Sequence, residues 1–152
     1  MNSPSQKLAE LGVELPSVAT PLGAYCPALV EGNQVLTSGQ LPLSDGALVA
    51  TGLVGGDVDV EDAKAAARVC ALNALAAAAS VAGGVDNLKR VVKVVGFVAS
   101  ADGFTAQPQV LNGASEFFGE VFGEAGTHAR SAVGVAMLPA GAPVEVEVVF
   151  GL

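Results

Sequence analysis

The sequence has few of the residues on which several kinds of binding and catalysis depend. Its 152 residues include no Trp, one Tyr, one His, two Cys and seven Lys and Arg. Nucleic-acid binding needs basic residues that neutralise phosphates, and seven basic against fifteen acidic residues, a net charge of −8, argue against it. Cys26 and Cys70 form no CxxC or CxxH motif, so we expect two buried free thiols rather than a disulfide or a zinc site.

Signals for membranes, secretion and nucleotides are also missing. The uncharged stretch from residue 69 to residue 85 has 17 residues and is mostly alanine, whereas a spanning helix needs about 20. Residues 1–10 lack the basic and then apolar pattern of a signal peptide. The glycine pairs at 55–56 and 83–84 match no phosphate-binding motif. We therefore expect a cytoplasmic protein with no membrane partner, no nucleic acid, no metal and no organic cofactor.

The chain is instead rich in apolar residues. Hydrophobic residues make up 51% of it and charged residues only 14%, which excludes intrinsic disorder. The length suits one domain over residues 1–152, with residues 1–20 as an N-terminal arm or short helix. So few charges cannot cover a monomer's surface well, and we expect an oligomer.

The pattern of apolar residues predicts an α+β two-layer sandwich, with a mostly antiparallel sheet and two helices on one face. The first helix has Asp59 or Asp57 as its cap and ends at Gly83. Residues 139–142 are expected to form a hairpin loop between the last two strands. The expected elements are a hairpin of 25–30 and 34–38, a possible strand in 48–53, helix 63–81, strand 88–99, helix 108–123, and strands 130–138 and 143–150.

Arg130 and Glu145 are the strongest candidates for chemistry. Strand periodicity places Arg130, Ala132 and Gly134 on one face. In the last strand it separates Glu145 and Glu147 from the valines between them. On hairpin-paired strands, the guanidinium would bind a substrate carboxylate and a glutamate would position water. The alternative is a solvent-facing strand with a cross-strand ion pair.

Other polar residues carry weaker signals. His128 has no Ser or Cys partner at a recognisable spacing, so we interpret it as a loop histidine. Tyr25 is expected to pack in the core with a solvated hydroxyl. Ser38 and Gly39 form either a turn or a site of close backbone approach. The glutamates at 116, 120 and 124 share one helical face and are expected to be solvated.

Three motifs together resemble the reactive intermediate deaminase family, also called RidA or YjgF and grouped with endoribonuclease L-PSP. They are the run GNQVLTSGQLP from Gly32, the helical segment 112–118, and the ending ARS at 129–131 with LP at 138–139 and VEVE at 144–147. The resemblance covers about residues 25–150. It implies a chorismate mutase-like fold that assembles as a homotrimer with clefts between subunits.

The activity that the resemblance implies is the hydrolysis of reactive 2-imino or enamine acids to 2-keto acids and ammonia, without a cofactor. By position, Arg130 would hold the substrate carboxylate and Glu145 would orient the attacking water. Tyr25, Ser38 and Gly39 would line the pocket, and Ala132 would offer a backbone amide.

The chain also departs from the family pattern. Ala132 stands where a cysteine is common, and Gly134 stands where a glutamate is common. A few extra residues precede the second helix near Gln107. These differences motivate the alternative that the cleft binds or senses a small carboxylate, such as a 2-keto acid, without turnover. A structural oligomer with a vestigial cleft is the third alternative.

Overall fold

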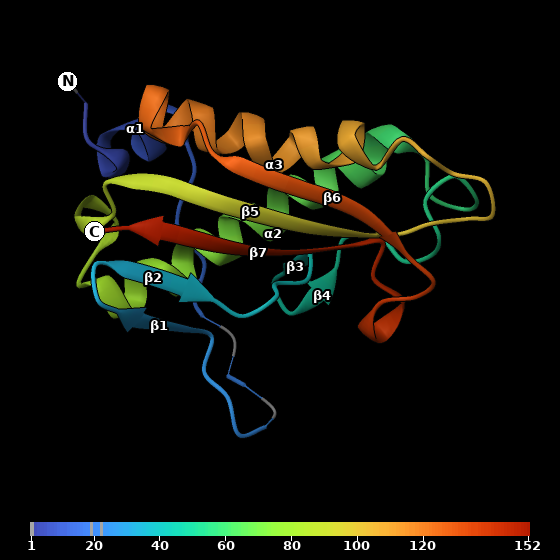
Figure 1. The fold of residues 1–152 in the computed structure, drawn as a ribbon, viewed down its shortest axis with the longest axis horizontal. Helices are drawn as coiled ribbons and strands as arrows, with labels where there is room; N and C mark the ends of the chain where they lie inside the picture. The colour runs from blue at the N-terminus through green and yellow to red at the C-terminus, as the bar shows by residue number, and fades with distance from the viewer. Residues whose placement is uncertain (1, 19, 22) are drawn as a thin grey trace.

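A five-stranded sheet forms the centre of the computed structural model, which describes residues 2–18, 20–21 and 23–152 (Figure 1). The strands lie in the order β1-β2-β7-β5-β6, so β1 and β6 are the two edges. Every neighbouring pair is antiparallel except β5 and β6, which are parallel. The strand bounds are Ala28–Glu31 (β1), Gln34–Thr37 (β2), Arg90–Ala99 (β5), Ala129–Val135 (β6) and Val144–Gly151 (β7).

The predicted hairpin between the last two strands is wrong, because β5 lies between β6 and β7. Helix α3 (Gln107–Phe122) connects β5 to β6, and a helical crossover of this kind makes the two joined strands parallel neighbours. The chain then turns through the short 3-10 helix η3 (Pro139–Gly141) and passes across the end of β5 to reach β7. Arg130 and Glu145 are therefore two strands apart.

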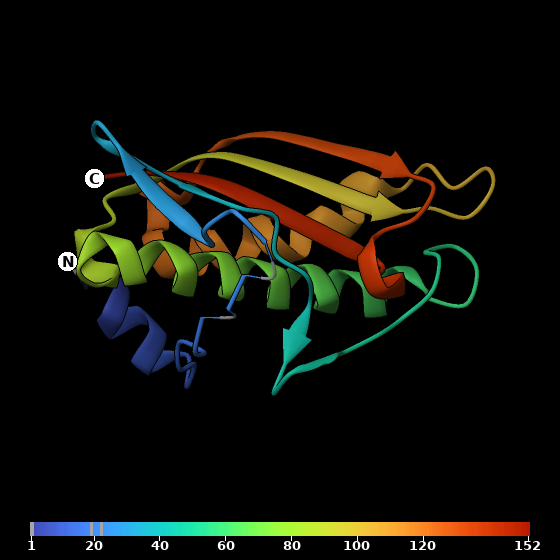
Figure 2. The ribbon, with the colours of Figure 1, turned by 90° about the horizontal axis from the view of Figure 1, so that it is seen from below.

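Helices α2 (Val60–Ala82) and α3 cover one face of the sheet, as predicted (Figure 2). The side chain of Asp59 accepts a hydrogen bond from the Asp62 amide at the start of α2. Gly83 ends the helix in the left-handed conformation at φ 82°, which glycine adopts without a steric penalty. The fold is the expected α+β two-layer sandwich.

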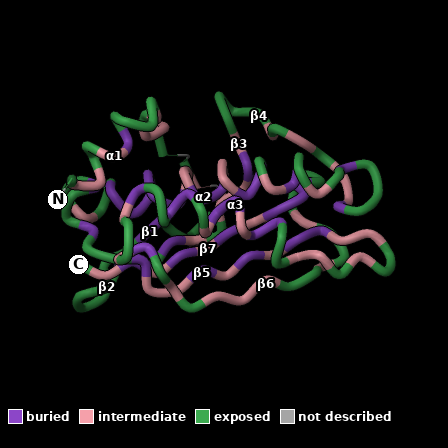
Figure 3. Tube along the Cα trace, turned by 90° about the horizontal axis from the view of Figure 1, so that it is seen from above, coloured by how far each residue is buried: buried purple, intermediate pink, exposed green. Residues whose placement is uncertain are grey.

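The hydrophobic core lies between the two helices and the sheet (Figure 3). Helix α2 has 23 residues and is long and apolar enough to cross a membrane, but eleven of them are buried inside the protein, so it is a core helix. Small residues let the helices approach closely. A Cβ atom added to Gly113 of α3 would lie 2.0 Å from the backbone oxygen of Lys64 in α2.

Several smaller elements differ from their predictions. The strand expected in 48–53 is replaced by a two-residue ladder between β3 (Leu43–Ser44) and β4 (Ala47–Leu48). Strand β6 ends at Val135 rather than Leu138. The N-terminal segment contains helix α1 (Pro4–Glu10), which carries a Ser3 capping box and packs on α3 and the 3-10 helix η1 (Val85–Asn87).

Among the surface residues, Cys26 differs from expectation because it is exposed, whereas Cys70 is buried as predicted. The glutamates at 116, 120 and 124 are exposed, as predicted. Two of them also form ion pairs: Glu116 with Lys64 at 3.1 Å and Glu120 with Arg68 at 2.8 Å. These ion pairs join α3 to α2 at the surface.

Candidate active site

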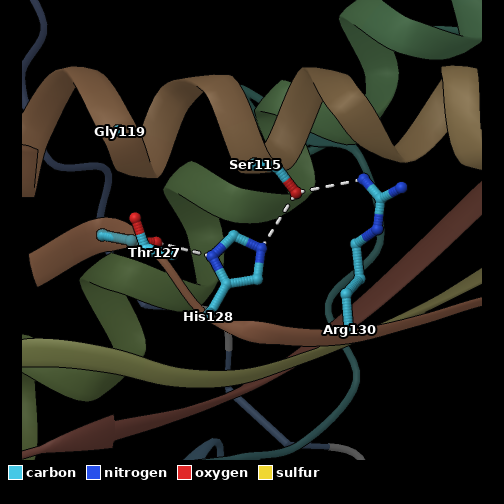
Figure 4. A pocket seen from close by; sticks show the side chains of 6 residues that line it. Ser115, Gly119, Thr127, His128 and Arg130 are labelled. Atoms are coloured by element: carbon cyan, nitrogen blue, oxygen red, sulfur yellow. Dashed lines mark hydrogen bonds between the residues drawn. The ribbon is translucent and has the colours of Figure 1, made fainter. Parts of the chain in front are cut away.

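Arg130 lies at the edge strand β6 and points toward α3 on the helix-covered side of the sheet (Figure 4). Its register partner is Val94 of β5, whose side chain is buried in the core. The Arg130 Nη1 donates to Asn112 Oδ1 at 2.9 Å and to Ser115 Oγ at 3.2 Å. Both partners are neutral, and among the described residues no carboxylate forms an ion pair with Arg130. The guanidinium is thus held in place with its charge unpaired.

His128 joins this cluster from the loop between α3 and β6, so it is a loop histidine as predicted, but it has a serine partner that the sequence did not indicate. Its Nε2 lies 2.9 Å from Ser115 Oγ, and its Nδ1 lies 2.6 Å from the carbonyl oxygen of Gly126. The 3-10 helix η2 (Gly123–Gly126) follows α3 and returns the chain toward β6, which brings positions 115 and 128 together. Ser115, His128 and Arg130 border a pocket of about 330 Å³ together with Gly119, Gly126 and Thr127.

Glu145 lies in a second cluster, at the start of β7 on the face of the sheet that no helix covers. A Cβ atom added to Gly39 would lie 2.7 Å from Glu145 Oε1, so the carboxylate rests directly on the Gly39 backbone. Partial burial and the nearby charge of Glu147 raise the pKa of the Glu145 carboxyl above its ordinary value. Ser38 and Gly39 do not form a turn, and the backbone at Gly39 lies close to the Glu145 side chain.

Tyr25 and Ser38 belong to the segments beside Gly39. The Ser38 hydroxyl donates to the Cys26 carbonyl at 2.6 Å, and its amide donates to the Pro27 carbonyl at 2.8 Å. These bonds tie the end of β2 to the chain next to Tyr25. The Tyr25 side chain is 58% exposed, which corrects the expectation that it packs in the core.

The predicted site residues therefore form two groups that do not meet within one chain. Along β5, Arg130 is level with Val94 and Glu145 is level with Phe97, and an offset of three residues places the two side chains on opposite faces. Strand spacings give a separation of roughly 14 Å between their backbones. Arg130 and Ala132 form one group on β6. Gly39 and Glu145 form the other, with Ser38 next to Gly39 and joined by a hydrogen bond to Cys26, the residue that follows Tyr25.

Gly134 shows how this chain fills the space beside β6. A Cβ atom there would lie 2.8 Å from Gln107 Nε2 and 3.0 Å from Ser100 Oγ. Gln107 donates to Ser100 at 3.1 Å and to the Phe104 carbonyl at 2.9 Å. The residues expected as an insertion near Gln107 thus form the first turn of α3 and occupy the room next to Gly134. Among the described residues, no group of three His, Cys, Asp or Glu side chains is placed to hold a metal ion.

The fold and these two clusters define a chorismate mutase-like α+β protein, and the family comparison agrees. A model described as "YjgF/chorismate mutase-like, putative endoribonuclease" matches residues 5–149. The chain therefore belongs to the YjgF family.

Individual relatives support this assignment. Protein TCP17 of Trypanosoma cruzi is 45% identical over 146 residues, which cover 95% of this chain and 91% of that protein. A crystal structure of a "putative endoribonuclease" from Shewanella oneidensis is 34% identical, with a TM-score of 0.95 over 99% of this chain and 100% of that one. Escherichia coli TdcF with bound serine is 27% identical, with a TM-score of 0.64 over 89% of this chain and 93% of that one.

Proposed function

We propose that the protein is a cytoplasmic hydrolase that deaminates small 2-imino or enamine acids to 2-keto acids and ammonia. The observation that carries this proposal is the Arg130 guanidinium, which is fixed by Asn112 and Ser115 but has no anionic partner among the described residues. Arginine binds carboxylates in a bidentate, charge-assisted manner. Such a guanidinium is suited to hold the carboxylate of an amino-acid-derived imine.

In this proposal, Glu145 orients the attacking water and removes its proton. A carboxyl with a raised pKa is a better base toward water than an ordinary glutamate, because its conjugate acid is weaker. Gly39 contributes no side chain beside the Glu145 carboxylate, which leaves this side of the carboxylate to its backbone. Tyr25 is exposed, and in this proposal it helps to line the site.

Because the two groups lie on opposite faces of one sheet, the proposed site combines Arg130 of one subunit with Glu145 of the next in a homotrimer. Strand β6 is an edge of the sheet, and Arg130 on it is half-buried, so in this proposal a second copy approaches the sheet at this edge. Among the described residues no helix covers the face that carries Glu145, and its side chains are largely apolar. They include Leu29, Leu36, Val95, Phe97, Val133 and Val149, and burying such a face is a common reason for assembly.

Ligand chemistry in the family is consistent with this class of substrate. The TdcF structure holds serine, a small molecule with a carboxylate and an amino group. RNA cleavage, which the family description names, fits this chain less well because it has only seven basic residues and a charge of −8.

The test is a coupled assay in which a pyridoxal phosphate-dependent dehydratase generates the imine from serine or threonine. Adding the protein should accelerate the release of keto acid, and Arg130→Ala should abolish the acceleration. Arg68→Ala, which removes an exposed arginine of α2 that pairs with Glu120, is the matched control and should keep the wild-type rate. An absence of acceleration over several amino-acid-derived imines would refute the proposal.

The alternative is binding without turnover, which Ala132 and Gly134 favour because they stand where the family pattern has larger polar residues. In that case a 2-keto acid such as pyruvate should raise the melting temperature of the wild type and not of Arg130→Ala, while imine hydrolysis stays at the background rate.

A further inference from the structure

The contacts among α3, η2 and β6 form a second reactive arrangement, of which the deaminase proposal uses only the Ser115 contact that holds Arg130. Ser115 Oγ and His128 Nε2 are 2.9 Å apart, and His128 Nδ1 is 2.6 Å from the Gly126 carbonyl oxygen. Figure 4 shows the two side chains pointing toward one another, with Arg130 on the far side of Ser115. A nucleophile, a base within hydrogen-bonding distance and a third group that orients the base are the parts of an activated serine.

The Gly126 carbonyl fixes the tautomer of the neutral imidazole. A carbonyl oxygen only accepts hydrogen bonds, so Nδ1 carries the proton and donates it to Gly126. Nε2 is then unprotonated and accepts the hydrogen bond from the Ser115 hydroxyl. The histidine is thus in the form that removes a proton from serine.

Arg130 adds a positive charge beside the reacting oxygen. Its Nη1 donates to Ser115 Oγ at 3.2 Å, and Asn112 holds the same nitrogen from the other side at 2.9 Å. A cation fixed at this distance stabilises both a serine alkoxide and the oxyanion that forms when serine attacks a carbonyl. Asn112 keeps the guanidinium in position without neutralising it.

We propose that Ser115 and His128 form a catalytic dyad that hydrolyses small acyl esters in the pocket between α3 and β6. The pocket, of about 330 Å³, is open to solvent and has room for a short acyl group. This site requires neither Glu145 nor a second copy of the chain. It is therefore separate from the deaminase reaction, although the two share Arg130.

The reaction proceeds through an acyl-serine. Ser115 Oγ forms a bond to the carbonyl carbon of the ester, and its proton passes to His128 Nε2. The bond from that carbon to the alcohol oxygen breaks, and the alcohol leaves with the proton from Nε2. Water then attacks the acyl-serine and gives a proton to Nε2, which returns it to Ser115 as the carboxylic acid departs. The reaction involves no oxidation or reduction and no cofactor.

A fluorophosphonate probe tests the dyad, because it phosphonylates activated serines. Intact-mass and peptide mass spectrometry should show one addition, at Ser115, in the wild type and in the matched control Ser131→Ala. Ser115→Ala should show none. His128→Gln should react about 100-fold more slowly, since general-base assistance contributes at least that factor. An initial burst of nitrophenol from p-nitrophenyl acetate should follow the same order among the variants.

A second variant gives a readout that does not depend on how well His128→Gln folds. The thiol introduced by Ser115→Cys should be alkylated by iodoacetamide faster than the exposed Cys26 thiol of the same molecule. The proposal is overturned if the wild type is not phosphonylated at Ser115, or if folded His128→Gln reacts at the wild-type rate. It is also overturned if the introduced thiol reacts more slowly than Cys26. None of these probes contains an imine, so failure here leaves the deaminase test unaffected.

Discussion

The close approach of α2 and α3 at Gly113 gives a quantitative test of the packing on which the Arg130 cluster depends. In Gly113→Ala the new Cβ would lie 2.0 Å from the Lys64 carbonyl oxygen and 2.9 Å from its carbonyl carbon. Both atoms belong to backbone within α2, so they cannot turn aside as the end of a flexible side chain would. To restore an ordinary van der Waals distance between these atoms, the helices must move apart by more than 1 Å at this point.

The expected cost follows from two opposing terms. Overpacking a well-filled core costs about 1–3 kcal/mol, and a backbone obstacle places this site at the upper end. Replacing glycine by alanine inside a helix stabilises the folded protein by about 1 kcal/mol. The free energy of unfolding of Gly113→Ala should therefore fall by about 2 kcal/mol, and its melting temperature should fall by about 4–8 °C for a chain of this size.

Gly119→Ala is the matched control, because it makes the same change in the same helix. A Cβ atom at Gly119 would have none of the neighbouring heavy atoms of the described residues within 4 Å, so only the helix-propensity term remains. Gly119→Ala should be more stable than the wild type by about 1 kcal/mol. Urea denaturation followed by circular dichroism, at one fixed protein concentration, measures both variants. Equal effects of the two substitutions, or a stabilised Gly113→Ala, would refute the described packing.

Three further predictions concern individual side chains. Burial and Glu147 raise the pKa of the Glu145 carboxyl, so the folded state binds this proton more tightly than the unfolded chain. The contribution of Glu145 to the free energy of unfolding must then decrease as the pH rises. The decrease begins near the pKa of the unfolded chain, about 4.3, and ends above the pKa of the folded protein. Glu145→Gln should flatten the stability profile over this window and increase stability at neutral pH; a profile identical to wild type would contradict the assigned environment. Ellman's reagent should titrate one thiol, Cys26, in the native protein and a second, Cys70, only on unfolding, because Cys70 is buried and burial raises the pKa of its thiol; two reactive thiols in the native protein would show that α2 is not packed as described. Asn112→Ala should raise KM for the imine more than it lowers kcat, since it frees the Arg130 guanidinium, and an unchanged KM would show that Asn112 does not position Arg130.

Local patterns in the sequence predicted most of the fold. The alanine-rich helix with its Asp59 cap and Gly83 terminus is specified by residues close together in the chain, and the structure confirms it. Period-two alternation correctly separated Arg130 from Val133 and Glu145 from Val146 on their own strands. These features depend on local backbone geometry, which sequence spacing encodes.

The order of strands could not be predicted in the same way. A short loop between residues 135 and 144 resembles a hairpin connection, yet β5 occupies the place next to β6 because α3 makes a parallel crossover. That difference places β5 between the strands of Arg130 and Glu145, and the register along β5 then puts the two side chains on opposite faces. The Ser115 and His128 pair was missed for a related reason: the residues are thirteen apart, on different elements, and only the path of η2 brings them together. The sequence did contain one signal: Ser115 and His128 lie on either side of the glycine-containing end of α3, and Arg130 follows His128 by two residues.

The central claim is that one active site uses Arg130 and Glu145 from two different subunits. Mixing subunits of Arg130→Ala and Glu145→Gln, each inactive alone, tests it most directly. In randomly mixed trimers about a quarter of the subunit interfaces pair an intact Arg130 with an intact Glu145, so imine hydrolysis should recover to about a quarter of the wild-type rate. If the mixture, verified to contain both variants in one oligomer, stays inactive, the shared site does not exist.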